Sequence, residues 1–218
     1  MGLSRINRRR LLLAGLGGGA LLLSSPGVFA ELLLTPAQTP GPFYPDRLPL
    51  DQDNDLLIVG DQPTLARGIV VQLYGQILDA RGNPLKGALV EIWQVDANGI
   101  YLHSRDGDRA RRDLNFQGYG RFETASDGHY RFRTLRPVPY PGRAPHIHFA
   151  VTLPGQPRFT TQCYIRGERL NQADAVLNAI REPRLRERLI VPFVPVAGTR
   201  AGEQIAQFDI VLNVTPAS

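Results

Sequence analysis

The sequence has 218 residues, of which 43% are hydrophobic, 25 are Lys or Arg and 20 are Asp or Glu, giving a formal net charge of +5. Its 22 glycines and 18 prolines stay below the fraction that is typical of disordered, low-complexity chains. This length and composition predict one folded domain with a hydrophobic core, with room for a short appendage. The positive charge would point to a nucleic-acid partner only if it belonged to the folded part.

The excess charge belongs to the N-terminal segment. Residues 1–30 contain no acidic residue and four arginines, Arg5, Arg8, Arg9 and Arg10. Without these four, 21 basic and 20 acidic residues remain, so residues 31–218 carry a net charge of +1 and no nucleic-acid partner is expected. The arginines precede a short, apolar, glycine-rich stretch that ends near Ala30. We predict an export signal of the twin-arginine type over 1–30, a periplasmic or extracellular protein, and no stable membrane insertion after its removal.

The rest of the chain divides into an arm and a strand-rich domain. Residues 31–68 are rich in proline and have no clear hydrophobic period, which predicts an extended arm on the surface. Residues 69–218 are expected to form the catalytic domain. Its expected strands span 69–78, 88–95, 129–134, 146–153, 158–165, 189–194 and 205–214.

Short strands separated by turn residues predict an all-β protein, an antiparallel β-sandwich of the transthyretin or immunoglobulin kind with long loops. One short helix is expected near 171–181, with Asn171 as its N-cap and Pro183 beyond its end. The single cysteine, Cys163, is expected to be a buried structural residue.

The sharpest local signal for a site is His146-Ile147-His148 within a predicted strand. Because side chains in a strand alternate between faces, both imidazoles would project from one face, with Cα atoms about 7 Å apart, and could bind one metal ion. No second cysteine and no adjacent acidic residue supports a zinc site. If tyrosines such as Tyr101 and Tyr140 supply further ligands, the metal must be a strong Lewis acid, because free phenol has a pKa near 10.

Several motifs occur in a characteristic order. They are Thr39–Pro45 (TPGPFYP), Gly87–Gln94 (GALVEIWQ), Asn98–Tyr101, Ser126–Thr134 (SDGHYRFRT), Pro139–Pro141 (PYP), Arg143–Phe149 (RAPHIHF) and Thr161–Tyr164 (TQCY). Taken together, they resemble the intradiol ring-cleavage dioxygenases of the protocatechuate 3,4-dioxygenase type. The resemblance covers nearly all of the chain after the predicted signal.

This resemblance implies a mononuclear non-haem Fe(III) cofactor bound by two tyrosinates and two histidines. The matching positions are Tyr101, Tyr140, His146 and His148, with Tyr140 and His146 axial. By the same resemblance, Arg143 would lie over the substrate ring and stabilise its negative charge, while Gln162 and Trp93 would belong to the substrate pocket. Tyr140 would also accept a proton from the substrate.

The expected reaction is O₂-dependent cleavage of a catechol-type diol between its two hydroxylated carbons, giving a cis,cis-muconate. The sequence leaves open which catechol is used, whether the chain forms a homo-oligomer and whether it needs a second subunit. Only five residues separate Tyr140 from His146, fewer than in the protocatechuate enzymes, so recognition of a ring carboxylate is not implied.

Two alternatives remain at this point. A cupin-like metalloenzyme also uses an HxH pair, but it requires a nearby Glu and a later His; residues 149–167 contain no acidic residue and no His follows His148. A non-catalytic, transthyretin-like binding sandwich is the other, because Asp79–Glu91 resembles such modules and a sandwich alone implies no reaction.

Overall fold

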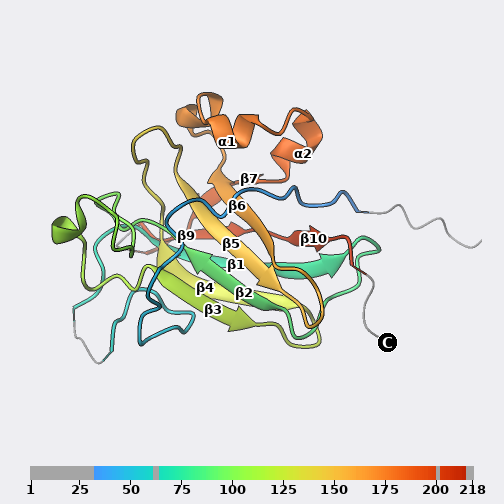
Figure 1. Cartoon of the computed structure of the whole chain (residues 1–218), viewed down its shortest axis with the longest axis horizontal. Coiled ribbons are helices and arrows are strands. Elements are labelled where there is room, and N and C mark those ends of the chain that lie inside the picture. Colours follow the sequence, from blue (N-terminus) through green and yellow to red (C-terminus); the bar gives the residue numbers. More distant parts are fainter. Residues whose placement is uncertain (1–31, 61–63, 200–201, 215–218) are drawn as a thin grey trace, which may run out of the picture.

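The computed structural model describes residues 32–60, 64–199 and 202–214, so the predicted export signal at 1–30 lies outside the described residues. The described chain is mostly β-structure, as the sequence predicts, and its strands form two five-stranded sheets (Figure 1). No helix in the described part has the length and apolar character needed to cross a membrane.

The first sheet is built around a long central strand. It contains β1 (Val70–Asp79), β4 (His129–Leu135), β8 (Phe193–Pro195), β9 (Gln204–Gln207) and β10 (Ile210–Leu212). Strand β1 pairs antiparallel with β4 and parallel with both β9 and β10. Its alternating burial, with Val71 and Leu73 inside and Gln72 between them outside, follows the period of two read from the sequence.

The second sheet carries the histidine pair. Its strand order is β3 (Tyr119–Glu123), β2 (Leu89–Trp93), β5 (His146–Thr152), β6 (Phe159–Ile165) and β7 (Ile190–Val191). Strand β5 lies in the middle, antiparallel to both β2 and β6, and all but its last residue are buried. A site on β5 is therefore surrounded by strands on both sides.

The expectation of purely antiparallel strands is wrong. The pairs β1·β9, β1·β10 and β6·β7 are parallel, because the C-terminal part of the chain returns along existing strands in their own direction. Strand β3 was not expected from the sequence. The strand expected over 205–214 is instead two strands, β9 and β10, separated by Phe208 and Asp209. At this break the Phe208 carbonyl lies so close to Gly75 of β1 that a Cβ at position 75 would clash with it.

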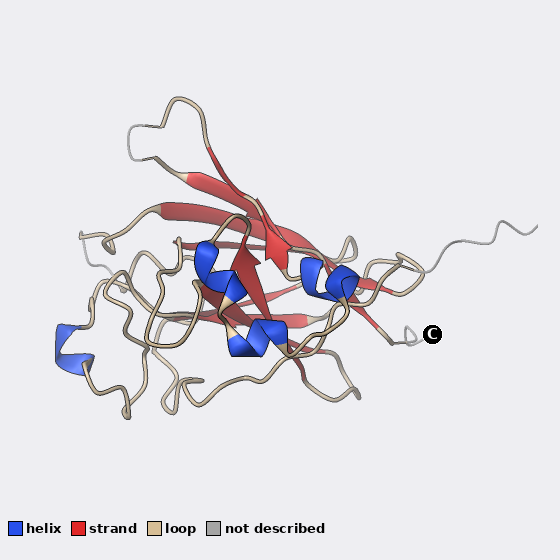
Figure 2. Ribbon diagram, turned by 90° about the horizontal axis from the view of Figure 1, so that it is seen from above, coloured by secondary structure: helices blue, strands red, loops and turns tan. Residues whose placement is uncertain are grey.

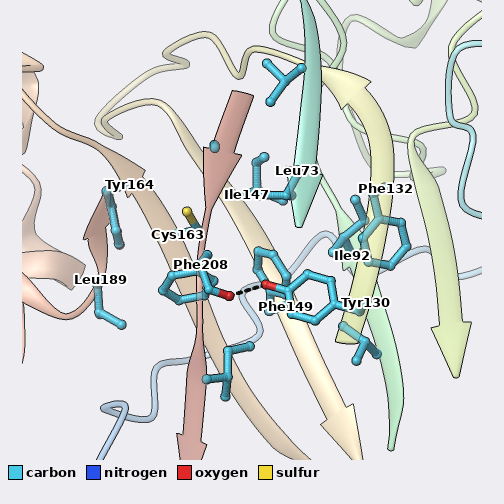
Figure 3. Packing of buried hydrophobic residues seen from close by; sticks show 14 of the residues in the cluster. Leu73, Ile92, Tyr130, Phe132, Ile147, Phe149, Cys163, Tyr164, Leu189 and Phe208 are labelled. Atoms are coloured by element: carbon cyan, nitrogen blue, oxygen red, sulfur yellow. Dashed lines mark hydrogen bonds between the residues drawn. The ribbon is translucent and has the colours of Figure 1, made fainter. Parts of the chain in front are cut away.

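Buried side chains of both sheets form one hydrophobic cluster (Figure 3). Tyr130 of β4 packs against Phe149 of β5, with ring centroids 5.8 Å apart, and its hydroxyl donates a hydrogen bond to the Phe208 carbonyl. Cys163 is a free, fully buried thiol in this cluster, as predicted. The shared core fixes the position of β5 relative to the other sheet.

The helical region differs from the expected helix over 171–181. It consists of the 3₁₀ helix η2 (Arg169–Gln172) and two short helices, α1 (Ala175–Asn178) and α2 (Pro183–Glu187). Asp174, not Asn171, is the N-cap of α1, and Pro183 begins α2 instead of lying beyond a helix end. Pro183 suits the first turn of a helix because it has no N–H to leave unpaired. In Figure 2 these three helices lie close together, and the 3₁₀ helix η1 (Arg109–Arg111) lies at a distance from them.

Residues 32–46 contain no helix or strand, and Pro36 to Thr39 lie along β6 of the second sheet. Gln38 donates its backbone N–H to the Thr160 carbonyl at 2.8 Å, and the Gln162 side chain donates to the Thr39 carbonyl at 3.0 Å. Further along, Leu56 and Leu57 are fully buried in the core. The division into an arm at 31–68 and a domain at 69–218 stays a prediction.

Candidate metal centre

The two histidines of β5 project from one face, and the register of the sheet places other predicted residues beside them. His148 lies between Trp93 on β2 and Gln162 on β6. The Nε2 atoms of His146 and His148 are 3.1 Å apart, and both side chains are 2% exposed. Ile147 points to the opposite face and belongs to the hydrophobic core.

Tyr101 reaches this face from a loop that closes on Asp96. The Asp96 carboxylate accepts the backbone N–H groups of Asn98 and Ile100, and Gly99 adopts a φ of 81°, which favours glycine. The Tyr101 N–H in turn donates to the Asp106 carboxylate at 2.9 Å. The loop therefore fixes Tyr101 through backbone contacts and leaves its phenol free to point at the histidines.

Tyr140 and Arg143 are brought together by a tight turn. The Arg143 N–H donates to the Tyr140 carbonyl at 3.0 Å, with Pro141 and Gly142 between them. Proline at the second position and a glycine with φ of 80° at the third are what a type II turn requires. This turn explains why so short a connection can place both a phenol and a guanidinium at the site.

The four predicted ligand side chains converge. The Tyr101 hydroxyl is 3.0 Å from His148 Nε2, 3.4 Å from His146 Nε2 and 3.5 Å from the Tyr140 hydroxyl. Donor atoms bound to one metal at about 2.0–2.1 Å are about 2.8–3.4 Å from their neighbours. The spacing of the Tyr101, His146 and His148 atoms therefore fits a single metal ion, and the Tyr140 hydroxyl lies just beyond this range from that of Tyr101.

The protonation of the histidines also fits metal binding. His146 Nδ1 lies 2.6 Å from the Ala144 carbonyl, which can only accept, so Nδ1 carries the hydrogen and Nε2 presents a bare lone pair. Burial, followed by the charge of Arg143, lowers the pKa of His146 to about 4. Burial, followed by His146 and Arg143, lowers the pKa of His148 well below its usual value. Both imidazoles are thus neutral ligands at neutral pH.

The two phenols differ in exposure. Tyr101 is 2% exposed, and burial together with Tyr140 raises its pKa well above 10, so only a strong Lewis acid would hold it as a phenolate. Tyr140 is only partly buried. Tyr101 and Tyr140 both line a cavity of about 640 Å³, together with Phe43, Pro139 and Pro141. This volume lies within the range of small-molecule sites.

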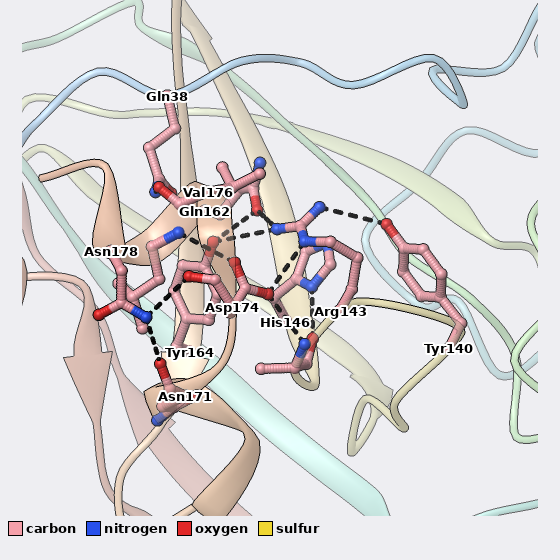
Figure 4. Close-up of polar contacts among 12 residues, drawn as sticks. Gln38, Tyr140, Arg143, His146, Gln162, Tyr164, Asn171, Asp174, Val176 and Asn178 are labelled. Carbon is pink, nitrogen blue, oxygen red and sulfur yellow. Dashed lines mark hydrogen bonds and ion pairs between the residues drawn. The ribbon is translucent and has the colours of Figure 1, made fainter.

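Arg143 is the centre of a buried polar network (Figure 4). Its guanidinium donates to Asp174 at 2.9 Å, to Gln162 at 2.5 Å, to Tyr164 at 3.1 Å and to the Tyr140 hydroxyl at 3.3 Å. Burial alone would lower the pKa of Arg143, but Tyr164, Tyr140 and Asp174 together raise it. A permanent positive charge is therefore held beside Tyr140.

Asp174, like Tyr164, is a residue of this network for which the sequence predicts no role. Its side chain is fully buried and accepts from Arg143, from the Ala144 N–H at 2.8 Å and from the Leu177 N–H at 2.9 Å. Burial raises its pKa, but these hydrogen bonds and the charge of Arg143 lower it overall. The available signal was an Asp directly before Ala-Val-Leu, which is a good N-cap position.

Trp93 lies directly beside one of the predicted ligands. It is fully buried, and its ring stacks on that of His148 with centroids 4.8 Å apart and an interplanar angle of 6°. It therefore contacts a predicted ligand; like Arg143 and Gln162 it is not among the residues that line the cavity, and its place in a substrate pocket stays a prediction. Gln162, also fully buried, contacts Arg143.

A cupin-like ligand set is not found. Within the described residues, no group of three or more His, Cys, Asp or Glu side chains lies close enough to hold a metal ion. The further donor that does lie beside the histidine pair is the Tyr101 hydroxyl. The fold and the site together define a mostly β-sheet protein with a donor set of two tyrosines and two histidines, of which all but Tyr140 are buried.

Comparison with known proteins identifies the family. Residues 39–214 match the dioxygenase family model, and the chain belongs to this family of intradiol ring-cleavage dioxygenases. The chain is 39% identical over 176 residues to the protocatechuate 3,4-dioxygenase beta chain of Burkholderia cepacia, covering 76% of this chain and 72% of the relative. It is 30% identical over 207 residues to hydroxyquinol 1,2-dioxygenase of Corynebacterium glutamicum, covering 82% of this chain but only 63% of that relative.

Solved structures agree with this assignment. The dioxygenase domain of a dioxygenase carbohydrate-binding protein fusion from Streptomyces sp. SirexAA-E superposes with a TM-score of 0.63 at 29% identity, covering 84% of this chain and all of that domain. Catechol 1,2-dioxygenase from Acinetobacter sp. ADP1 gives a TM-score of 0.63 at 26% identity, covering 82% of this chain and 62% of the other. These relatives are enzymes, so the comparisons favour catalysis over the non-catalytic binding sandwich.

Proposed function

We propose that this protein is a non-haem Fe(III)-dependent intradiol dioxygenase that cleaves a catechol-type diol with O₂ to a cis,cis-muconate. The observation that carries the proposal is the convergence of Tyr101, Tyr140, His146 and His148, of which the two tyrosines also line a cavity. Two neutral imidazoles and two phenols suit a hard, oxidised metal ion. Lewis acidity is the chemistry that ferric iron would supply there, holding the diol in its deprotonated form and making its ring reactive toward O₂.

Tyr140 is the residue we assign to proton transfer. Tyr140 lines the cavity and, unlike Tyr101, has a partly exposed side chain. A phenolate at this position can take a proton from a substrate hydroxyl. The neighbouring Arg143 guanidinium, 3.3 Å away, stabilises the phenolate before that transfer.

Arg143 then serves the substrate. Asp174 and Gln162 hold its guanidinium from two sides, so its orientation is set before substrate enters. Negative charge that develops on the diol ring meets a fixed positive charge. Phe43 and the prolines around Tyr140 supply apolar surface to the cavity.

Oxygen uptake and product analysis test this function. With catechol, the protein should consume O₂ and form cis,cis-muconate, and His148→Ala and Tyr101→Phe should abolish both. Uptake that survives both substitutions would contradict the proposed site. Comparing catechol, protocatechuate, hydroxyquinol and chlorocatechols would identify the preferred ring substituents.

We further propose that the chain acts without a different partner subunit, alone or as a homo-oligomer, since one chain supplies all four donors. Among its relatives are both the beta and the alpha chain of protocatechuate 3,4-dioxygenase. Light scattering on the purified active protein tests this proposal.

The finer fold assignment, a transthyretin-like sandwich, rests on the core shared by the two sheets.

Export is proposed from the sequence of residues 1–30. Fusing this segment to a reporter should direct the reporter out of the cytoplasm. Replacing Arg8, Arg9 and Arg10 with Lys should retain it inside, because the twin-arginine route reads the arginines themselves. A reporter that is exported equally well after this change would contradict the proposed route.

A further inference from the structure

The imidazole of His148 lacks the support that His146 has. Its Nδ1 atom is buried and has no hydrogen-bond partner among the described residues, whereas His146 Nδ1 bonds to the Ala144 carbonyl. Metal-binding histidines almost always donate their second ring N–H to an acceptor, which fixes the plane of the ring. The plane of the His148 ring must be fixed in some other way.

Aromatic packing is the contact that can do this. The Trp93 ring stacks flat on His148, and Tyr44 of the N-terminal segment packs against Trp93 in an edge-to-face arrangement, with ring centroids 5.0 Å apart and an interplanar angle of 85°. Stacked and edge-on pairs of this kind are favourable arrangements of aromatic rings. The orientation of His148 therefore depends on where Tyr44 is held.

Tyr44 is held by a buried carboxylate. Glu91 is 6% exposed, and one of its oxygens, Oε1, accepts the hydroxyls of both Tyr44 and Tyr119 at 2.7 Å. Its other oxygen, Oε2, pairs with Arg158 at 2.9 Å, and the Arg158 guanidinium also lies 4.4 Å from the Tyr44 ring centroid. Burying a carboxylate is costly unless its oxygens are satisfied, as they are here.

The position of Glu91 on its strand connects it to the metal-binding face. Glu91 and Trp93 are two residues apart on β2, so both project from the same side of the sheet. We propose that Glu91 is a positioning residue for the metal centre: it fixes Tyr44 against Trp93, and Trp93 fixes the plane of the His148 ring. The inference rests on the proposed iron site, and it makes the N-terminal segment part of that site.

Two matched substitutions separate positioning from general stabilisation. Tyr44→Phe and Tyr119→Phe each remove one hydroxyl that donates to the same Glu91 oxygen at the same distance. Of the two rings, it is that of Tyr44 that packs edge-on against Trp93. Both variants should therefore lose a similar amount of thermal stability, but Tyr44→Phe alone should disturb the metal centre.

The readouts are the rate of iron release to a chelator and the rhombicity of the ferric EPR signal, measured on the iron-loaded proteins. Tyr44→Phe and Glu91→Gln should release iron about 3- to 10-fold faster than wild type, less than the 10- to 100-fold loss of affinity when a direct partner of a ligand is removed. Both should also change the EPR signal. Tyr119→Phe should stay within about twofold of wild type and keep its signal.

Equal effects of Tyr44→Phe and Tyr119→Phe on iron release and EPR would overturn the inference, as would wild-type behaviour of Tyr44→Phe. A wild-type protein that binds no iron would overturn the proposed function as well. The two failures are therefore distinguishable in one set of measurements.

Discussion

The two histidines of β5 are held in opposite ways. His146 lies on the polar side of the site, where its ring bonds to the Ala144 carbonyl and the adjacent Arg143 is anchored by Asp174. His148 lies on the aromatic side, where it stacks on Trp93 and its Nδ1 has no partner among the described residues. Two residues apart in sequence, they depend on different parts of the chain.

This difference separates two tasks. The polar side supplies fixed charge next to Tyr140, so changes there should affect catalysis and the stability of that charge network. The aromatic side supplies shape, so changes there should affect how firmly the metal is held.

The largest effect is expected from removing either imidazole. His146→Ala and His148→Ala should each lower iron affinity by at least about 100-fold, because losing a ligand costs more than losing a partner of a ligand. Metal analysis after gel filtration measures this loss. His129→Ala is the control, since His129 is exposed at the start of β4. Full iron content in His148→Ala would show that the aromatic side does not bind metal.

Arg143→Lys should lower kcat by about 100-fold while iron content stays at the wild-type level. Lysine keeps the positive charge, but its single ammonium cannot reach Asp174, Gln162 and Tyr164 at once. Steady-state oxygen uptake gives kcat. Arg166→Lys, at an exposed ion pair with Glu187, should leave kcat unchanged. A loss of iron in Arg143→Lys would contradict the separation of tasks.

Asp174→Asn should lower the free energy of unfolding by about 2–3 kcal/mol, because it removes the counter-charge of a largely buried guanidinium. Urea titration measures this change. The matched control, Glu187→Gln at the exposed pair, should cost less than about 0.5 kcal/mol.

The pH dependence of stability gives a second check on Asp174. Its pKa is lowered in the folded protein, so the stability it contributes is complete above its unfolded pKa of about 3.9 and is lost as the pH falls through the folded pKa. Asp174→Asn should lack this part of the acid transition. An unchanged acid limb in the variant would contradict a stabilising role for the ionised carboxylate.

The smallest effect concerns the turn that joins Tyr140 to Arg143. Gly142→Ala should destabilise the protein by about 1 kcal/mol, since alanine is strained at a φ of 80° although no atom obstructs its Cβ. Thermal unfolding measures the loss. Gly107→Ala is the control, because its Cβ would also meet open space and its φ lies outside the left-handed region. Equal losses would show that the turn geometry is not the cause.

Local patterns predict only the histidine pair of the site, and the family resemblance adds the two tyrosines. Alternation along β5 places His146 and His148 on one face, and the Pro-Tyr-Pro-Gly-Arg segment contains the residues of a tight turn. The strand β3 was missed because Gly118 and Gly120 interrupt its pattern; Gly120 is needed where the Asp53 carbonyl and Leu56 lie directly against it. That contact depends on a segment more than sixty residues away in the chain.

The supporting residues were harder to predict for the same reason. Asp174 meets Arg143 across 31 residues, and Tyr44 meets Glu91 across 47. No short-range period marks such pairs, because they arise only when the helical region and the N-terminal segment pack on the second sheet. The resemblance predicts Trp93 as a pocket residue, but its stacking on His148 could not be predicted from the sequence.

The most direct measurement is the visible absorption spectrum of the purified protein, recorded with its iron content. Two tyrosines bound to ferric iron should give a wine-red protein through tyrosinate-to-iron charge transfer, with a band that shifts when catechol is added and is lost together with the iron in Tyr101→Phe. A colourless protein that contains one iron per chain would contradict the assignment of Tyr101 and Tyr140 as ligands.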